Sequence, residues 1–306
     1  MARGQGSGTV FCVGQVAVLG DVGGHLGALQ EALTQLGCEG THIPEGLVVC
    51  QVGDLIHRGP SSGEVVTYVD EIMEKNPGQW VQLLGNHEEN EILRHQFEWP
   101  DRVDDTTRDT LMRWWEDGSM QLAWSFCAIG VRDPQTGELT HSPAHDAAAS
   151  SCTNCGEVLV SHAGMTVGVW EKLERTQSAH DAARLINAER YNYQHTVWNT
   201  GVMLERQIRR DAGVVWARAD DELLWFWNRE PGPGFHQVHG HSSAYNWSRG
   251  RYQRRDLEEI LSDRTSIDTR FRHLRTELEG GTIWGCDPQH GAVPVTNFAA
   301  LVFETL

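Results

Sequence analysis

The sequence lacks three features that would place it in common classes of protein: a long apolar run, an excess of basic residues and a regular set of cysteines. Its 306 residues contain no uninterrupted apolar stretch of about 18 residues, so no membrane-spanning helix is expected. Its formal charge is −17, from 25 basic and 42 acidic residues, whereas the phosphates of nucleic acids and anionic lipids attract clustered Lys and Arg. We therefore expect neither a membrane nor a nucleic acid as a partner.

The cysteines and the N-terminal segment favour a cytoplasmic protein. Seven cysteines form no regular disulfide framework, which is typical of a reducing compartment. The first residues show no charged segment followed by an apolar segment and a small-residue cleavage site. We expect residues 1–8 to be a disordered start.

Three further absences exclude a fold class, a type of nucleophile and a division of the chain into domains. No G-x-G-x-x-G motif opens a predicted helix, which argues against a Rossmann dinucleotide-binding domain. No Cys-x5-Arg loop is present to cradle a phosphate, so a cysteine nucleophile is not expected. No Pro- or Gly-rich linker divides the chain, which predicts a single domain over residues 9–306 with an insertion at about 90–156 and a helical segment at about 165–210.

Three apolar runs, at 16–21, 47–54 and 80–88, each lead into a polar tip. Asp21, Asp54 and Asn86 are spaced 33 and 32 residues apart, and one strand–helix–strand unit takes about 30 residues. Apolar periodicity predicts helices at 25–37 and 63–75 between the runs. The three tips are therefore expected at the C-terminal ends of parallel strands, where open α/β sheets bind ligands.

The rest of the chain continues the α/β pattern. Helices are predicted at 107–118, 179–192 and 196–210, and strands at 157–164, 235–243, 281–288 and 299–306.

Five short motifs place carboxylate, amide or imidazole groups on glycine-rich turns. They are GDVGGH (20–25), GDLIHRGP (53–60), GNHE (85–88), SHAG (161–164) and HGHSS (239–243). Oxygen and imidazole ligands together suit Mn²⁺, Fe or Zn²⁺. Two such ions can clamp a phosphate and activate a water for in-line attack. Each motif alone is a weak signal, but their order and spacing together indicate a metal site.

In this order the motifs resemble those of calcineurin-like metallophosphoesterases, in the phosphoprotein phosphatase branch that includes bacterial and phage Ser/Thr phosphatases and diadenosine tetraphosphatases. The resemblance spans roughly residues 16–245. It implies a four-layer α/β/β/α sandwich with a helical insertion. It also implies hydrolysis of phosphate esters by a metal-bound hydroxide at a centre of two divalent ions, with Mn²⁺ expected first and Fe or Zn²⁺ as alternatives.

The resemblance also implies the metal ligands. Asp54 would bridge the two ions, and Asp21 would hold the first. Asn86, His162 and His241 would complete the site of the second.

The remaining roles fall to one histidine and two arginines. By resemblance, His87 would protonate the leaving oxygen or stabilise charge beside it. Arg58 would bind phosphate oxygens with its planar guanidinium, and Arg218 would supply a second such group. The alternative for Arg218 is a surface ion pair with Asp220 or Asp221.

The sequence departs from the family pattern at two positions of this site. Gly23 stands where the family has a histidine ligand of the first metal, and His57 stands where it has an aspartate beside the catalytic histidine. Three interpretations stay open. His57 replaces the missing ligand, or His25 does so, or the first site is weak or empty, as in a one-metal enzyme or a pseudo-phosphatase. An imidazole at 57 would support a proton on His87 less than a carboxylate would.

A second candidate site lies in the segment HSPAHDAAASSCTNCGEV. His141, His145, Cys152 and Cys155 have the types and pair spacings of structural zinc ligands, which allows an additional structural Zn²⁺. The alternative is a polar hairpin tip with free thiols.

The sequence favours a metal-dependent phosphomonoesterase similar to protein phosphatases. A nucleotide or dinucleotide polyphosphate hydrolase is the alternative enzyme, and a non-catalytic pseudo-phosphatase binding module is the alternative of another class. The expected partner is a phosphorylated small molecule, a nucleotide or a phosphoprotein.

Overall fold

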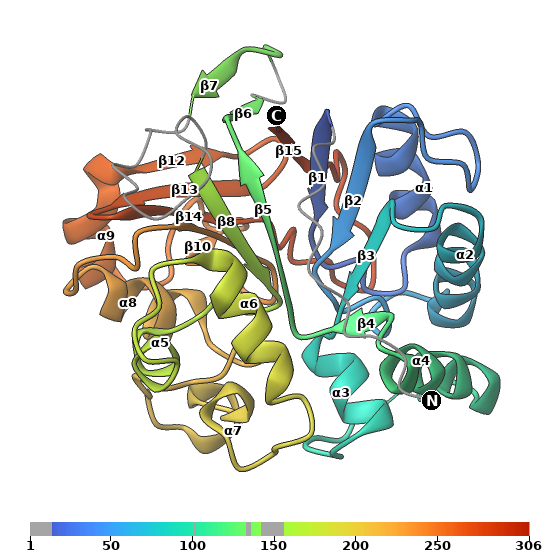
Figure 1. Cartoon of the computed structure of the whole chain (residues 1–306), viewed down its shortest axis with the longest axis horizontal. Coiled ribbons are helices and arrows are strands. Elements are labelled where there is room, and N and C mark those ends of the chain that lie inside the picture. The colour runs from blue at the N-terminus through green and yellow to red at the C-terminus, as the bar shows by residue number, and fades with distance from the viewer. Residues whose placement is uncertain (1–13, 101, 133–135, 142–155, 306) are drawn as a thin grey trace, which may run out of the picture.

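A computed structural model describes residues 14–100, 102–132, 136–141 and 156–305, and shows two large sheets flanked by helices (Figure 1). The first sheet has the order β4-β3-β2-β1-β15-β6-β7. Its strands β1 to β4 are parallel, and β15, β6 and β7 continue it antiparallel. The bounds are β1 Gln15–Leu19, β2 Leu47–Gln51, β3 Trp80–Leu83, β4 Met120–Gln121, β6 Gly130–Arg132, β7 Leu139–His141 and β15 Leu301–Glu304.

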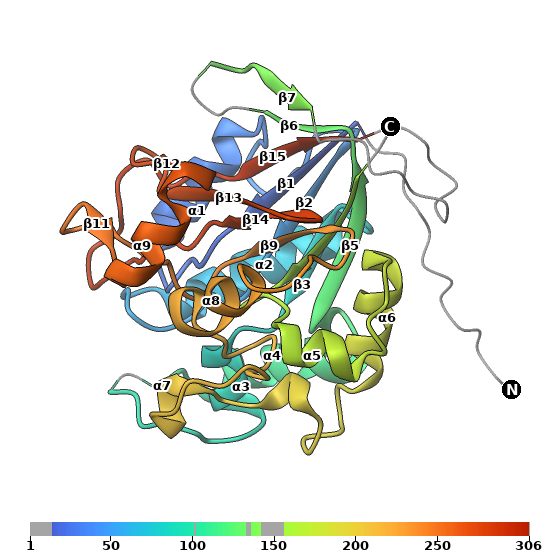
Figure 2. The ribbon, with the colours of Figure 1, turned by 90° about the vertical axis from the view of Figure 1, so that its left-hand side faces the viewer.

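The second sheet has the order β12-β13-β14-β9-β8-β5. Strands β8, β9 and β14 are parallel to one another, and β9 and β14 run side by side (Figure 2). The bounds are β5 Ala123–Ala128, β8 Gly156–Ser161, β9 His236–His239, β12 Thr265–Asp268, β13 His273–Leu278 and β14 Gly281–Gly285; a short hairpin joins β10 Tyr245–Asn246 to β11 Arg251–Tyr252.

The two sheets pack against each other through a buried apolar layer. Val18 and Phe303 of the first sheet share this layer with Val158 and Val238 of the second. Helices α1, α2 and α4 flank the first sheet, and α6 packs on β5 and β8 of the second (Figure 1). The expected four-layer α/β/β/α sandwich is confirmed. Helix bounds are α1 Leu26–Gln35, α2 Ser62–Lys75, α3 Asn86–Ile92, α4 Asp105–Asp117, α5 Val167–Lys172, α6 Ala179–Ala188, α7 Val202–Glu205, α8 Leu224–Trp227 and α9 Arg255–Leu261.

Local sequence explains the helices that follow β1 and β2. In α1 the apolar side chains of Leu29 and Leu33 are buried, and Gly37 adopts the left-handed conformation (φ 84°) that commonly ends a helix. Helix α2 buries one face and carries Glu64 in its first turn and Lys75 in its last, which complements the helix dipole. These helices connect β1 to β2 and β2 to β3, which pair as parallel neighbours in the first sheet.

The prediction of a continuous helix over 196–210 is wrong. The structure has a single 3-10 turn at Thr196–Trp198 and the four-residue helix α7. Gly201 interrupts the helix because its φ is 62°. The buried Glu222 carboxylate accepts hydrogen bonds from the backbone N–H groups of Val202 (2.8 Å) and Arg209 (2.9 Å), which fixes a loop instead.

Other predictions concern segments that the structure describes in part. The expected disordered start at 1–8 and the possible zinc ligands His145, Cys152 and Cys155 lie outside the described residues; His141 is described only as backbone, at the end of β7. The interval at about 90–156, predicted as an insertion, supplies strands to both sheets. Within the described residues, no helix is long and apolar enough to span a membrane.

Candidate active site

Five loops bring the predicted ligands to one edge of the sandwich. Asp21, Asp54 and Asn86 follow β1, β2 and β3 of the first sheet, while His162 and His241 follow β8 and β9 of the second. All five side chains are buried. Because each set of strands is parallel, their C-terminal ends meet at the same edge, as the spacing of the motifs predicts.

The loops are held in unusual conformations by the Glu88 carboxylate. Its oxygens accept hydrogen bonds from the backbone N–H groups of Asp54 (2.7 Å), Leu55 (2.8 Å) and Gly85 (3.0 Å). Asp54 itself has φ 56°, a strained conformation for a residue with a side chain. A Cβ atom on Gly85 would lie 2.3 Å from Asp54 Oδ1, so this position requires glycine. The GNHE glutamate therefore positions the loops that carry the ligands.

The clearest candidate for a metal site is formed by Asp54, His162 and His241. One ligand atom from each lies within 4.8 Å of the others. Asn86 Oδ1 joins them, 2.9 Å from His241 Nδ1 and 3.1 Å from His162 Nε2. These are the four ligands that the resemblance assigns to the second ion. Mixed carboxylate, amide and imidazole donors fit a divalent transition metal.

The protonation states of the side chains in this cluster also favour the binding of a cation. His162 Nδ1 lies 3.0 Å from the carbonyl oxygen of Val52, which can only accept, so Nδ1 carries the proton and Nε2 presents a lone pair to the cluster. Burial lowers the pKa of His162, which keeps the ring neutral. Burial opposes ionisation of Asp54, but His87, His162 and His241 together hold its pKa well below its usual value.

A second group of carboxylates lies beside this cluster. Asp21, Asp287 and Arg58 line a cavity of about 250 Å³, together with Gly23, His241, Ser242, Gln289 and His290. Burial raises the pKa of Asp21 well above its usual value, and the carboxylates of Asp287 and Asp54 raise it further. Burial likewise raises the pKa of Asp287 to about 6. Within the described residues, neither Asp21 nor Asp287 forms an ion pair, and the charge of Arg58 offsets only part of the effect of burial on their pKa values.

Asp287 and His290 are site residues that sequence reasoning missed. They follow β14, which pairs with β9, and the Cys286 N–H donates to the His239 carbonyl oxygen (2.8 Å). A Cβ atom on Gly23 would lie 3.7 Å from His290 Cβ, so His290 borders the space that a side chain at 23 would enter. The sequence carries a signal for Asp287, because this aspartate stands next to the last residue of the strand predicted at 281–288.

The structure places His57 and His25 beside other partners. His57 Nδ1 lies 2.6 Å from His87 Nδ1, and His57 Nε2 lies 3.3 Å from Glu91 Oε1. His25 Nε2 lies 2.9 Å from the carbonyl oxygen of Gly291. Neither histidine belongs to the cluster of ligand atoms around Asp54, and their roles as metal ligands stay predictions.

The two predicted phosphate-binding arginines differ in their surroundings. Arg58 is exposed, forms no hydrogen bond or ion pair within the described residues, and lies 5.6 Å from the ring centre of Trp99. The Arg218 guanidinium instead contacts Asp220 (2.8 Å) and Asp221 (3.5 Å), which is the alternative that the sequence left open. Arg58 is thus available to an anionic ligand, whereas Arg218 would have to exchange partners.

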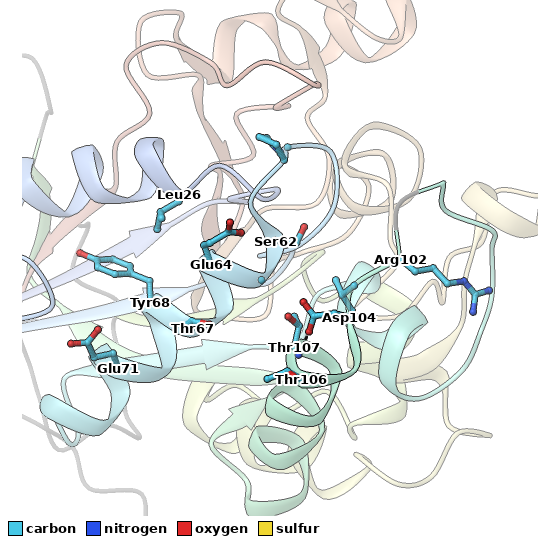
Figure 3. A pocket seen from close by; sticks show the side chains of 14 residues that line it. Leu26, Ser62, Glu64, Thr67, Tyr68, Glu71, Arg102, Asp104, Thr106 and Thr107 are labelled. Atoms are coloured by element: carbon cyan, nitrogen blue, oxygen red, sulfur yellow. Dashed lines mark hydrogen bonds between the residues drawn. The ribbon is translucent and has the colours of Figure 1, made fainter.

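An open groove of about 940 Å³ is lined by residues that follow Arg58 in the chain, starting with Gly59. Gly59 and Pro60 contribute to its lining, together with α2 from Ser62 to Glu71 and the first turn of α4 (Figure 3). Most of the side chains that line it are polar: Ser62, Glu64, Thr67, Tyr68, Glu71, Arg102, Asp104, Thr106 and Thr107.

Buried carboxylate, amide and imidazole groups at the strand ends of a four-layer sandwich form the arrangement expected of a metallohydrolase. The family model described as calcineurin-like phosphoesterase matches residues 14–268, and the chain belongs to this family. The resemblance seen in the sequence is confirmed. The protein is therefore a phosphate ester hydrolase of a family that uses divalent metal ions.

Solved structures with some similarity are distant. A cold-active protein tyrosine phosphatase is 13% identical with a TM-score of 0.49, over 95% of this chain and 73% of the other. A protein serine/threonine phosphatase from Saccharomyces cerevisiae is 11% identical with a TM-score of 0.38, over 96% and 81%. A crystal structure described as a putative diadenosine tetraphosphatase is 18% identical with a TM-score of 0.29, over 50% and 52%. No match was found among curated proteins.

Proposed function

We propose that this chain is a phosphomonoesterase with two divalent metal ions, Mn²⁺ foremost, acting on phosphorylated segments of proteins. The observation that carries the proposal is the cluster of Asp54, His162 and His241, with Asn86 completing four ligands around one point. Bound ions would polarise the phosphate and activate a water for in-line attack.

For the other ion we propose Asp21, Asp54 and Asp287 as ligands. Asp21 and Asp287 line one cavity and are buried, and neither forms an ion pair within the described residues, whereas Arg58 in the same cavity is exposed. Burying carboxylates together is costly unless a cation compensates their charge. Asp287 would thus supply a ligand in place of the side chain that Gly23 lacks.

The chain's own polar groups would bind the phosphate and protonate the leaving group. Arg58 is exposed at the rim of the cavity and free to form two parallel hydrogen bonds to phosphate oxygens. His87 Nε2 lies 3.8 Å from Asp54 Oδ2, which puts this nitrogen beside the bridging ligand. A proton held on His87 Nε2 could pass to the leaving oxygen.

The groove lined by α2 and α4 supports a protein substrate. It is open and mostly polar, and Gly59 and Pro60, which follow Arg58 in the chain, are among the residues that line it. A nucleotide hydrolase would require a pocket for a base, and bases are commonly held by apolar and aromatic side chains. An extended polypeptide carrying a phosphorylated side chain fits an open polar groove better.

Hydrolysis by the purified chain tests this proposal. With Mn²⁺ added, we expect release of phosphate from p-nitrophenyl phosphate and from phosphopeptides, and a loss of at least ~100-fold in Asp54→Asn. Asp181→Asn, an exposed substitution on α6, serves as the control. Hydrolysis restricted to bis-phosphoryl esters would favour a polyphosphate hydrolase. Inactivity with Mn²⁺, Fe²⁺ and Zn²⁺ would favour a pseudo-phosphatase.

A further inference from the structure

We propose that Glu91 is a positioning residue that orients the leaving-group histidine, His87, through the ring of His57. The inference rests on the proposed function, because it assigns His87 the role stated there. It gives His57 a place in the site as the link between a carboxylate and the catalytic imidazole.

The three side chains form a continuous buried row. Glu91 lies four residues after His87 on α3, so both project from the same face of that helix. His57 comes from the loop after β2 and lies between them, 2.6 Å from His87 Nδ1 and 3.3 Å from Glu91 Oε1. The His57 and Glu91 side chains are 0% and 5% exposed, so water does not compete for these contacts.

The ring of His57 is fixed from a second direction by an aromatic side chain. Trp99 stacks on it with ring centres 5.3 Å apart and planes inclined by 16°. The same indole meets His87 edge-on at 4.7 Å. Stacking keeps the His57 ring nearly parallel to the indole, which leaves two orientations related by a 180° turn about the Cβ–Cγ bond. The contacts with His87 and Glu91 then favour the orientation in which Nδ1 faces His87 and Nε2 faces Glu91.

The row assigns the positions of the protons. His57 Nε2 is buried and forms no hydrogen bond within the described residues, and its charged neighbour is Glu91 Oε1 at 3.3 Å. A carboxylate only accepts hydrogen bonds, so a small rotation of either side chain would let a proton on His57 Nε2 be donated to Glu91. With its proton on Nε2, neutral His57 presents a lone pair at Nδ1, which accepts from His87 Nδ1–H. His87 Nε2 is thereby directed to Asp54 and the substrate side.

This arrangement extends the pair of groups that the resemblance implies. In the family pattern a carboxylate contacts the catalytic histidine directly, and here an imidazole separates them. Among the described residues, Glu91 has one other charged partner, Arg108, whose Nη2 lies 3.5 Å away on α4 and which forms no hydrogen bond with either histidine. Arg108 therefore offers a control variant, because it contacts Glu91 from outside the row.

The first test compares leaving groups. If Glu91 orients His87 for proton donation, Glu91→Gln lowers kcat for phenyl phosphate about tenfold more than for p-nitrophenyl phosphate, whose leaving group needs no proton, and leaves KM unchanged. Arg108→Met is expected to leave the ratio of the two rates unchanged. Equal losses on both substrates, or the same change of ratio in Arg108→Met, would overturn the proposal.

A double substitution tests whether Glu91 acts through His57. His57→Asp places a carboxylate directly beside His87, so Glu91→Gln is expected to have no further effect on the ratio in that background. An equal effect in both backgrounds would show that Glu91 acts by another route.

A readout without activity separates this proposal from the proposed function. In ¹⁵N-histidine spectra, neutral His57 is expected to carry its proton on Nε2, and His87 is expected to carry a proton on Nδ1 in its neutral form as well as in the doubly protonated form that donates from Nε2. The populations of these tautomers are expected to shift in Glu91→Gln. His57→Asn and His87→Asn assign the signals. A His57 ring that is protonated on Nδ1, or that does not respond to Glu91→Gln, would contradict the proposal even in a protein without hydrolase activity.

Discussion

At position 57 an imidazole lies where the family pattern has a carboxylate, directly against the nitrogen of His87. Burial lowers the pKa of His57 to about 4, so it is neutral near pH 7 and cannot replace the charge of an aspartate. Burial also lowers the pKa of His87. The proton that His87 would donate is therefore less stable here than beside a carboxylate.

This difference predicts the pH dependence of His57→Asp. A carboxylate beside His87 raises the pKa of that histidine, so the protonated form persists to higher pH and the alkaline decline of kcat/KM moves upward. The measurement is the kcat/KM profile of both proteins from pH 5 to 9. Identical profiles would show that residue 57 does not tune His87.

The two arginines lead to a second prediction at this scale. Arg58→Ala is expected to lower kcat/KM by ~100-fold, since it removes an unpaired cation from the phosphate site. Arg218→Ala is expected to lower it by less than ~10-fold, because its guanidinium is held by Asp220 and Asp221. Steady-state kinetics on p-nitrophenyl phosphate measure the loss of kcat/KM in each variant. An equal loss in both variants would show that Arg218 exchanges partners and binds phosphate too.

Among the elements, the repeating strand–helix units could be predicted from the sequence, because apolar periodicity and glycine-rich turns act locally. Asp54 and His162, carried by motifs at strand ends, were predicted for the same reason. Glu91, Trp99 and Asp287 were not, because their roles depend on contacts between distant segments. Trp99, for example, lies after α3 but stacks on His57 from the loop after β2.

In the segment 196–210 the local pattern led to a wrong prediction. Its composition favours a helix, yet Gly201 and the buried Glu222 impose a loop. Met203 and Leu204 remain exposed as a result. Tertiary hydrogen bonds therefore override helix propensity here.

Gly201→Ala is expected to destabilise this loop. The added Cβ atom would lie 2.6 Å from both Glu222 carboxylate oxygens at φ 62°, which costs roughly 1–3 kcal/mol of the free energy of unfolding. Gly27→Ala is the matched control, because nothing lies within 4 Å of its Cβ position in α1 and alanine favours the helix. Urea unfolding measures both. Equal stabilities would contradict the strain assigned to Gly201.

For the molecule as a whole, buried neutral histidines link stability to pH. Burial lowers the pKa of His273 to about 4, and its Nε2–H donates to the Ala299 carbonyl oxygen (3.1 Å). Between pH 6.5 and 4 the unfolded chain binds this proton and the folded chain does not, so His273 favours unfolding increasingly as pH falls.

His273→Gln isolates this contribution. Other buried groups titrate equally in both proteins. Between pH 7 and 4.5 the free energy of unfolding of the wild type should therefore fall by on the order of 2 kcal/mol more than that of the variant. Urea unfolding at several pH values measures the difference. A difference that stays constant with pH would show that His273 is protonated in the folded protein.

We propose that the two sheets together hold two metal ions at one edge, with Asp54 shared by both ions and Asp287 a ligand of the first. Metal content by mass spectrometry, after loading with Mn²⁺ and removal of free metal, tests this arrangement. We expect two ions per wild-type chain, one in Asp287→Asn, and fewer than two together with lost hydrolysis in Asp54→Asn. Two ions retained in Asp287→Asn, or a single ion in the wild type, would contradict it.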